Sequence, residues 1–254
     1  MIQATRKHHV KLMTAYRLHF EPATLAAIEL VKSGQLGEGR YFNSSFSYNI
    51  AGENIRLQFA RGGGPLYDLG TYCINAARGL MRDEPDEVTG MLTRSADERF
   101  REVEETAAAI LRFPRGRLAT FAISFGSAET SRLEFVGTKG RLVMEPAYDY
   151  SKSLQQIVTI GDHVERKTFA RTDQFGGEIE AFSACILENR EPEPSGVEGL
   201  ADVRIIEAIF SSDARGRAVR FAPFKKPVRP TGRQVKRKPP VKKPPAIDAE
   251  APHD

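Results

Sequence analysis

The sequence predicts an α+β fold, in which a predominantly antiparallel open sheet has its helices packed on one face. Many short segments alternate apolar and polar residues with the period of a strand, and tight turns separate them. Helical periodicity appears in five stretches. Short consecutive strands joined by tight turns pair antiparallel, and a polar face on several strands leaves one side of the sheet uncovered.

The chain opens with helical segments. Residues 2–9 predict a short helix that has no capping residue before it, and residues 22–32 predict a helix with Pro22 in its first turn and Gly34 after its end. A further helix is expected over residues 69–80, directly after a run of glycines. Asp68 is its expected N-cap.

Strands dominate the middle of the chain. Phe42 and Phe46 alternate with Asn43 and Ser45, so that strand has one polar face. The same alternation predicts strands over residues 42–50, 88–93, 106–113, 118–125, 132–136, 141–144, 156–160 and 164–169.

Two helices and a tail complete the chain. Phe175, Ile179, Phe182 and Ile186 form one apolar stripe over residues 175–188, and the run 195–198 is a capping box before the last helix. From Lys225 onward lie nine of the 37 basic residues and seven of the 15 prolines, with too few apolar residues for a core. Residues 225–254 are therefore expected to be a disordered, basic, Pro-rich tail.

Composition excludes several classes of protein. The 254 residues contain no apolar run long enough to span a bilayer, and no signal peptide is recognisable. Cys73 and Cys185 are too far apart for a metal site or a disulfide framework, which indicates buried thiols and a cytoplasmic location. The five histidines show no metal-ligand spacing, so no metal is expected. No aromatic residue interleaves the basic residues of the tail, so nucleic acid is not an expected partner.

Residues 61–75 carry the densest group of chemically useful side chains. A helix beginning at Asp68 would place Asp68, Tyr72 and Asn75 on one face beside three glycines. A carboxylate, a phenol and an amide so placed can hold a polyhydroxy ligand and move a proton. The alternative is that Asp68 only caps the helix, Tyr72 packs, and the glycines form a tight turn.

Five segments resemble the glucose–fructose oxidoreductase and inositol dehydrogenase family. They follow one another in the family's order and cover roughly residues 1–222. They are Ala15-Tyr16-Arg17-Leu18-His19-Phe20-Glu21-Pro22, residues 62–72, Val136-Gly137-Thr138-Lys139-Gly140, Asp173-Gln174-Phe175 and residues 198–208. The Tyr at position 72 is most similar to the glucose–fructose oxidoreductase branch.

The resemblance implies a fold and a set of roles. Residues 1–20 would be the end of a cofactor domain, and residues 21–224 an α/β substrate and dimerisation domain that pairs subunits through its open sheet. NADP or NAD would be the cofactor, and a sugar or polyol the substrate. Tyr72 would be the catalytic acid/base, with Asp68 orienting it or the substrate. Residues near the substrate or cofactor would be Tyr16, Arg17, His19, Gly63 and Asn75; Arg17 could instead pair with Glu21, and Asn75 could be a packing residue.

The sequence departs from the family at the cofactor site. It contains no G-x-G-x-x-G and no Glu-Lys-Pro, the family element that supplies a catalytic lysine. We therefore expect the nucleotide-binding domain and the lysine to be absent, and the chain alone to be inactive. The alternative is a non-catalytic sugar-binding or dimerisation module with a basic tether.

Overall fold

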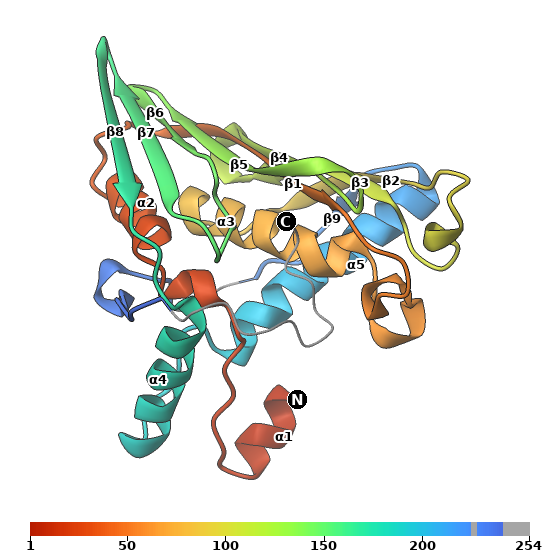
Figure 1. Ribbon diagram of the computed structural model, residues 1–254, viewed down its shortest axis with the longest axis horizontal. Helices are drawn as coiled ribbons and strands as arrows, with labels where there is room; N and C mark the ends of the chain where they lie inside the picture. The colour runs from red at the N-terminus through yellow and green to blue at the C-terminus, as the bar shows by residue number, and fades with distance from the viewer. Residues whose placement is uncertain (225–227, 241–254) are drawn as a thin grey trace.

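The computed structural model describes residues 1–224 and 228–240. A single large sheet forms one layer, and helices cover one of its faces (Figure 1). The helices are α1 Ile2–Lys7, α2 Pro22–Lys32, α3 Thr71–Met81, α4 Gln174–Leu187 and α5 Gly196–Arg215. The strands are β1 Gly39–Asn49, β2 Glu87–Thr93, β3 Thr106–Phe113, β4 Arg117–Ser124, β5 Gly126–Gly137, β6 Gly140–Met144, β7 Leu154–Ile160, β8 His163–Phe169 and β9 Val219–Arg220.

The sheet has the strand order β8-β7-β6-β5-β1-β4-β3-β2-β9. Its central strand, β1, pairs antiparallel with β5 and parallel with β4, and the other neighbours pair antiparallel. Phe42 of β1 lies opposite Phe135 on one side and Ala119 on the other. The predicted α+β class and the mostly antiparallel open sheet are therefore confirmed.

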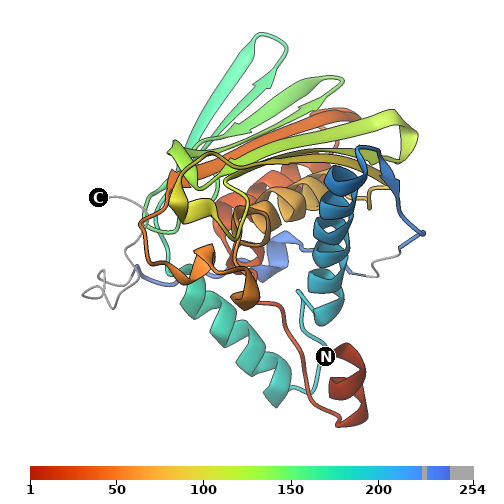
Figure 2. The ribbon, with the colours of Figure 1, turned by 90° about the vertical axis from the view of Figure 1, so that its right-hand side faces the viewer.

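The helices are not equally close to the sheet. The helices α2, α3 and α5 lie against it, whereas α4 and α1 lie furthest from it (Figures 1 and 2). The covered face buries large side chains such as Phe42, Phe121 and Phe135, each of which contributes about 1.5–3 kcal/mol by leaving water. On the uncovered face Tyr41 and Ile110 are about half exposed.

Local capping explains where two helices begin. Pro22 is the first residue of α2, and the buried Glu21 carboxylate before it accepts from the Ala23 and Thr24 amides over 2.8 and 2.6 Å. Ser195 caps α5 by accepting from the Val197 amide. The expected capping box is only half formed, because Glu198 instead reaches a buried arginine described below.

The apolar stripe that the sequence predicts on α4 is largely exposed and does not pack on the core. Phe175, Ile179 and Ile186 are about half exposed or more, and α4 buries Gln174, Gly177 and Glu178 instead. The helix begins after Asp173, whose carboxylate accepts from the Phe175 and Gly176 amides. The side of α4 that packs on the domain is thus the polar one at its first two turns.

Part of the expected disordered tail has a defined course. Residues 228–240, called the C-terminal segment below, lie against the domain, and a 3₁₀ helix spans Gly232–Gln234. Composition indicated a mobile arm because the segment has no core of its own. It differs from that expectation because its side chains and amides pair with acidic groups and carbonyls of the domain. The remainder of the expected tail, residues 225–227 and 241–254, lies outside the described residues.

Two further features concern the whole described chain. Within residues 1–224 and 228–240, no helix is both long and apolar enough to cross a bilayer. Cys73 and Cys185 are both buried free thiols.

Candidate functional site

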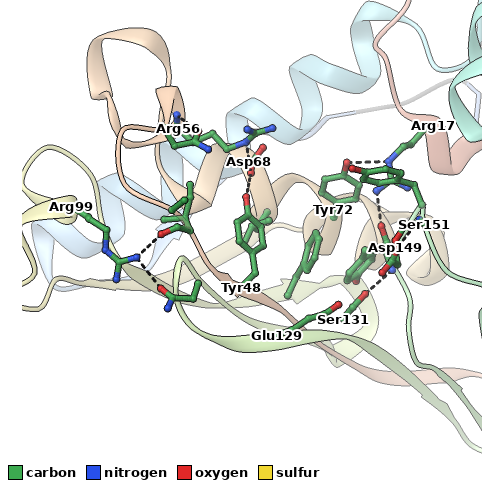
Figure 3. A pocket seen from close by; sticks show the side chains of 18 residues that line it. Arg17, Tyr48, Arg56, Asp68, Tyr72, Arg99, Glu129, Ser131, Asp149 and Ser151 are labelled. Atoms are coloured by element: carbon green, nitrogen blue, oxygen red, sulfur yellow. Dashed lines mark hydrogen bonds and ion pairs between the residues drawn. The ribbon is translucent and has the colours of Figure 1, made fainter. Parts of the chain in front are cut away.

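Tyr72 lies in the first turn of α3 and lines a cavity of about 390 Å³ (Figure 3). Arg17 donates from Nε to the Tyr72 hydroxyl over 3.3 Å. The rings of Phe46 and Tyr148 pack against the Tyr72 ring, with centroids 5.4 and 5.8 Å from its centroid. These contacts fix the ring and leave the hydroxyl beside a guanidinium at the cavity wall.

Arg17 is buried, and the hydrogen-bond partners that it has within residues 1–224 and 228–240 are neutral. It lies in a 3₁₀ helix, Arg17–His19, that precedes α2, and only 5% of its surface is exposed. Besides Tyr72, the guanidinium donates to the Gln174 side-chain oxygen and, over 2.5 Å, to the Tyr148 carbonyl oxygen. Its central carbon lies 4.9 Å from the Tyr72 ring centroid and 5.4 Å from that of Tyr150. Aromatic faces and neutral oxygens therefore contact this positive charge. Two buried carboxyls lie near it as well, because burial raises the pKa of Glu21 and of Glu178 and the charge of Arg17 opposes that rise.

Asp68 is not an N-cap, contrary to the expectation from the sequence. It lies within a π-helical turn, Leu66–Gly70, that leads into α3. Its carboxylate accepts from the Tyr48 hydroxyl and the Arg56 Nε, each over 3.0 Å. Burial, together with the charge of Asp68, raises the pKa of Tyr48 and keeps that phenol protonated. Asp68 thus holds two other side chains of the cavity in place.

The other end of the cavity is polar as well. Arg99 lies there, held by Asp97 over 2.7 Å and by the Asn49 side-chain oxygen over 2.9 Å (Figure 3). Burial opposes the charge of Asp149, but hydrogen bonds from Ser151 hold the pKa of that carboxyl below its usual value. Aromatic faces with polar groups at both ends suit a neutral, polyhydroxylated ligand. The lining residues are Arg17, Phe46, Tyr48, Asn49, Ile50, Ala51, Asn54, Arg56, Asp68, Leu69, Tyr72, Arg99, Glu129, Ser131, Tyr148, Asp149, Tyr150 and Ser151.

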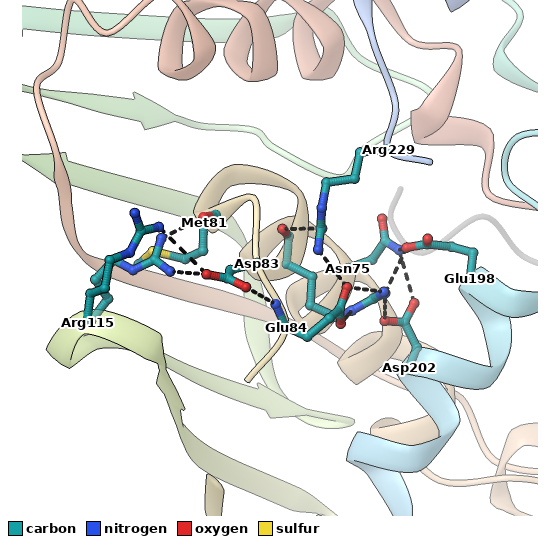
Figure 4. Close-up of polar contacts among 10 residues, drawn as sticks. Asn75, Met81, Asp83, Glu84, Arg115, Glu198, Asp202 and Arg229 are labelled. Carbon is teal, nitrogen blue, oxygen red and sulfur yellow. Dashed lines mark hydrogen bonds and ion pairs between the residues drawn. The ribbon is translucent and has the colours of Figure 1, made fainter. Parts of the chain in front are cut away.

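His19 and Asn75 belong to a buried polar network centred on Arg78. Figure 4 shows Asn75, Glu84, Glu198 and Asp202 of this network. The Arg78 guanidinium pairs with carboxylates of Glu84, Glu198 and Asp202 over 2.6, 2.7 and 2.5 Å. Burial lowers the pKa of Arg78, but the Asp202 and Glu84 carboxylates raise it above its usual value. Asn75 donates to Glu198 and Asp202 over 2.8 and 3.0 Å, and its oxygen lies 2.9 Å from His19 Nε2. Asn75 also lines a second cavity of about 230 Å³ next to Tyr72, whereas His19 lines neither cavity.

Two further residues from the sequence analysis are placed apart from the large cavity. Tyr16 lines only the smaller one, and burial together with the Asp202 carboxylate raises its pKa. Gly63 lines neither cavity. A Cβ on Gly63 would lie 2.4 Å from the Arg56 carbonyl oxygen, so this position needs glycine for a close backbone approach.

The glycine loop before α3 is filled by a side chain of the protein itself. Gly64 has a φ of 113°, and the buried Glu104 carboxylate lies where its Cβ would point. Glu104 accepts from the Leu66 amide over 3.0 Å, and burial raises the pKa of its carboxyl. The amides of Gly63 and Gly64 donate to carbonyl oxygens of residues 58 and 56. An internal carboxylate therefore occupies the position where such a loop would hold a phosphate.

Comparisons with known proteins connect this geometry to a family. The model of the GFO/IDH/MocA C-terminal domain matches residues 24–143. The structure superposes on that of an aldose-aldose oxidoreductase from Caulobacter crescentus, which was solved with glycerol. The TM-score is 0.82 and the sequence identity is 35%. The match covers 87% of this chain and 67% of that one. The chain belongs to the GFO/IDH/MocA family.

Other GFO/IDH/MocA relatives are NADP-dependent enzymes of sugars. An NADP-dependent D-xylose 1-dehydrogenase from Haloarcula marismortui is 31% identical over 229 residues, which is 87% of this chain and 63% of that protein. A 3-ketoreductase from Actinomadura kijaniata, solved with NADP and TDP-benzene, superposes with a TM-score of 0.75 at 26% identity and covers 83% of this chain and 65% of that one. This chain thus spans less than two thirds of the curated relatives' length.

The glycine loop does not fit the pyrophosphate of the family's NADP. Its amides already have acceptors, and Glu104 would repel a phosphate.

Several residues of the large cavity were missed by sequence reasoning. Tyr48 had a signal, because it alternates with polar residues in the predicted strand 42–50. No signal in the sequence indicated Arg56, Arg99 or Glu129, because these residues come from loops and from a strand end that only the fold brings together. Gln174, the partner of Arg17, belonged to a segment of the family resemblance but was not singled out.

Proposed function

We propose that the 390 Å³ cavity binds a sugar or polyol, and that Tyr72 transfers a proton to or from the hydroxyl or carbonyl undergoing oxidation or reduction. The observation that carries this proposal is the Tyr72 hydroxyl at the cavity wall, in hydrogen bond with the Arg17 guanidinium. The guanidinium donates to the hydroxyl oxygen and fixes its position at the wall, where it can exchange a proton with a substrate oxygen.

The walls have the chemistry that such a ligand needs. The rings of Phe46, Tyr48 and Tyr150 can cover the apolar faces of a sugar, and the polar side chains of Arg56 and Ser131 can contact its hydroxyl groups. The role assigned to Asp68 is to hold Tyr48 and Arg56 at the wall. His19 and Asn75 support the site from the Arg78 network.

NADP would supply or accept the hydride when bound. Glu104 fills the glycine loop, and we therefore assign dinucleotide binding to a nucleotide-binding domain outside residues 21–224. Residues 1–20 would connect to that domain, with Tyr16 and Arg17 nearest the nicotinamide. The NADP-dependent relatives support this assignment.

A second copy of the chain is the proposed partner of the uncovered sheet face. The exposed apolar side chains Tyr41, Met91, Ile110 and Leu118 lie on strands of the sheet, and an open sheet face suits a two-fold interface.

The experiment is a titration of the purified chain with D-xylose and D-glucose by calorimetry, and with NADPH by nicotinamide fluorescence. Aldose binding is expected to weaken about two- to tenfold in Tyr72→Phe, because one hydrogen bond is lost while the ring packing stays. The matched control is Tyr41→Phe on the open sheet face, which should bind aldoses unchanged. Absence of aldose binding would contradict the proposal.

The NADPH titration tests the assignment of the dinucleotide to another domain. We expect no NADPH binding and no aldose-dependent reduction of NADP by residues 1–254 alone. Micromolar NADPH binding would overturn the assignment of the dinucleotide to another domain. Aldose binding that Tyr72→Phe leaves intact would favour a non-catalytic sugar-binding module.

A further inference from the structure

The C-terminal segment (228–240) crosses the side of the domain opposite the sheet and contacts three separate elements. It begins beside α3 and passes α2, where the Gly232 amide donates to the Glu29 side chain over 2.9 Å. Pro230 is buried, and Val235 packs against the core. The short 3₁₀ helix of the segment lies next to α2 in Figure 1. The segment is therefore held by packing as well as by charge.

Its first anchor is the Arg78 network. The Arg229 guanidinium donates to the Arg78 carbonyl oxygen over 3.1 Å and to the Glu84 carboxylate over 2.8 Å (Figure 4). Glu84 thus accepts from two arginines, one in α3 and one in the C-terminal segment. Arg229 has 18% of its side chain exposed, so this pair is largely removed from water and is worth more than a surface ion pair.

Its last anchor joins two elements that hold Arg17. The Lys236 amide donates to the Phe20 carbonyl oxygen over 3.0 Å, directly after the 3₁₀ helix Arg17–His19. The Asp173 amide, just before α4, donates to the Lys238 carbonyl oxygen over 3.1 Å. The segment therefore forms a backbone bridge between the end of the 3₁₀ helix and the start of α4.

Side chains reinforce this bridge. Both Lys236 and Lys238 pair with Glu180 of α4, and these hydrogen bonds lower the pKa of Glu180 to about 2. Gly177 of α4 allows the close approach, because a Cβ there would lie 2.8 Å from the Lys236 Cβ and 3.8 Å from the Phe20 Cβ. The three chain segments thus meet at one point on the polar side of α4.

We infer that the C-terminal segment is a positioning element of the candidate site. It clamps the 3₁₀ helix Arg17–His19 to the start of α4, so that Gln174 holds the Arg17 guanidinium against Tyr72. The Arg17–Gln174 and Arg17–Tyr72 hydrogen bonds join these same elements, so their geometry depends on the spacing that the segment sets. The consequence for proton transfer rests on the proposed function, whereas the clamp itself does not.

The first test compares two truncations of the full chain. One ends at residue 227 and removes the C-terminal segment; its control ends at residue 240 and keeps it. Hydrogen exchange should become roughly tenfold faster at residues 17–20 and in the first turn of α4 in the shorter chain only, as the loss of one or two hydrogen bonds implies. Unchanged exchange at these amides in a shorter chain with native far-UV circular dichroism would overturn the inference.

A second test leaves the C-terminal segment in the chain. Gly177→Ala should displace Lys236, because its Cβ leaves too little room, and should reproduce the faster exchange at residues 17–20. Gly79→Ala is the matched control, since its Cβ would approach only Ile28, at 3.9 Å. Slow exchange at residues 17–20 in Gly177→Ala, although Lys236 is displaced, would count against the clamp.

A spectroscopic readout distinguishes positioning of Arg17 from general support of the fold. The chain has seven tyrosines and no tryptophan, so near-UV circular dichroism reports on tyrosines. Loss of the segment should change this signal in the parent chain and change it less in the Tyr72→Phe background. An equal change in both backgrounds would show that Tyr72 is not affected. Neither readout needs a sugar or NADP, so the outcome is independent of the aldose titrations.

Discussion

Replacement of Arg78 by methionine is the most demanding test of the buried network. Arg78 has no exposed surface, and its carboxylate partners Glu84, Glu198 and Asp202 have side chains exposed by 11, 3 and 0%. Removing the arginine leaves these negative charges close together with only part of their compensation. Breaking one buried pair costs about 3–5 kcal/mol. For a chain of this size such a loss lowers the melting temperature by roughly 6–20 °C.

The assay is thermal unfolding of Arg78→Met at pH 7 and pH 5. The matched control is Arg112→Met, because Arg112 pairs with Glu87 at 3.1 Å but has a side chain that is 62% exposed. An exposed pair contributes only about 0–1 kcal/mol, so this control should unfold within a few degrees of the parent. Equal destabilisation by the two substitutions would refute the importance that we assign to the network.

The same experiment also tests the direction in which pH changes the stability of Arg78→Met. In Arg78→Met, carboxylates left without their cation favour the protonated form in the folded state. The folded state then binds more protons than the unfolded state, so stability should rise as the pH falls from 7 to 5. Part of the loss in melting temperature should therefore be recovered at pH 5, relative to the parent chain at the same pH. A larger loss at pH 5 would contradict this reasoning.

Three further outcomes are expected. Asp68→Asn keeps the shape of the π-helical turn but removes the charge that holds Arg56. The affinity for aldoses, measured by calorimetry, should therefore fall about two- to tenfold. An unchanged affinity would contradict the role of Asp68. Ile110→Lys places a charge on the uncovered sheet face and should shift sedimentation toward the monomer; a parent chain that is already monomeric would refute the proposed interface. The pKa of Glu180 is lowered to about 2 from 4.5, so its bonds to the C-terminal segment persist above pH 4.5 and are lost as the pH falls toward 2. The protection of the Asp173 amide from hydrogen exchange, relative to an unfolded peptide at the same pH, should fall over that range, and in Glu180→Gln this protection should not change between the same two pH values.

The sheet could be predicted because its evidence is local. Residues 106–113 and 118–125 alternate so that every second side chain, including Leu111 and Phe121, is buried, and turn residues separate the two strands. A period of two residues needs no knowledge of the partner strand. The start of α2 was likewise predictable from Pro22.

The parts that could not be predicted depend on residues distant in the sequence. Asp68 was expected to cap a helix, but Tyr48 and Arg56 bind its carboxylate instead. Glu198 completes a capping box in the sequence, yet a buried Arg78 attracts a carboxylate more strongly than a helix amide does. Tyr72 was singled out by its spacing with Asp68 and Asn75, and Arg17 by the family resemblance, but their hydrogen bond across the fold is a finding of the structure.

The C-terminal segment illustrates the same limit. Its composition is typical of a disordered arm, since it has too few apolar residues to form a core. Its order comes from acidic groups that belong to α2, α4 and the loop after α3. The sequence of the segment alone does not reveal these partners.

The position of β1 in the sheet has a consequence for how the chain acquires its fold during synthesis. Tyr41 pairs with Leu118 on one side and with Val136 on the other, so neither edge of this central strand has its partner until much later residues have left the ribosome. The segments between them, which include α3, emerge while β1 is still an unpaired edge. Such non-local pairing is slow and exposes strand edges to other chains. We therefore expect the emergence of β4 and β5 to limit the rate of folding, and a pause in translation before them to be the stage at which nascent chains are most prone to aggregate.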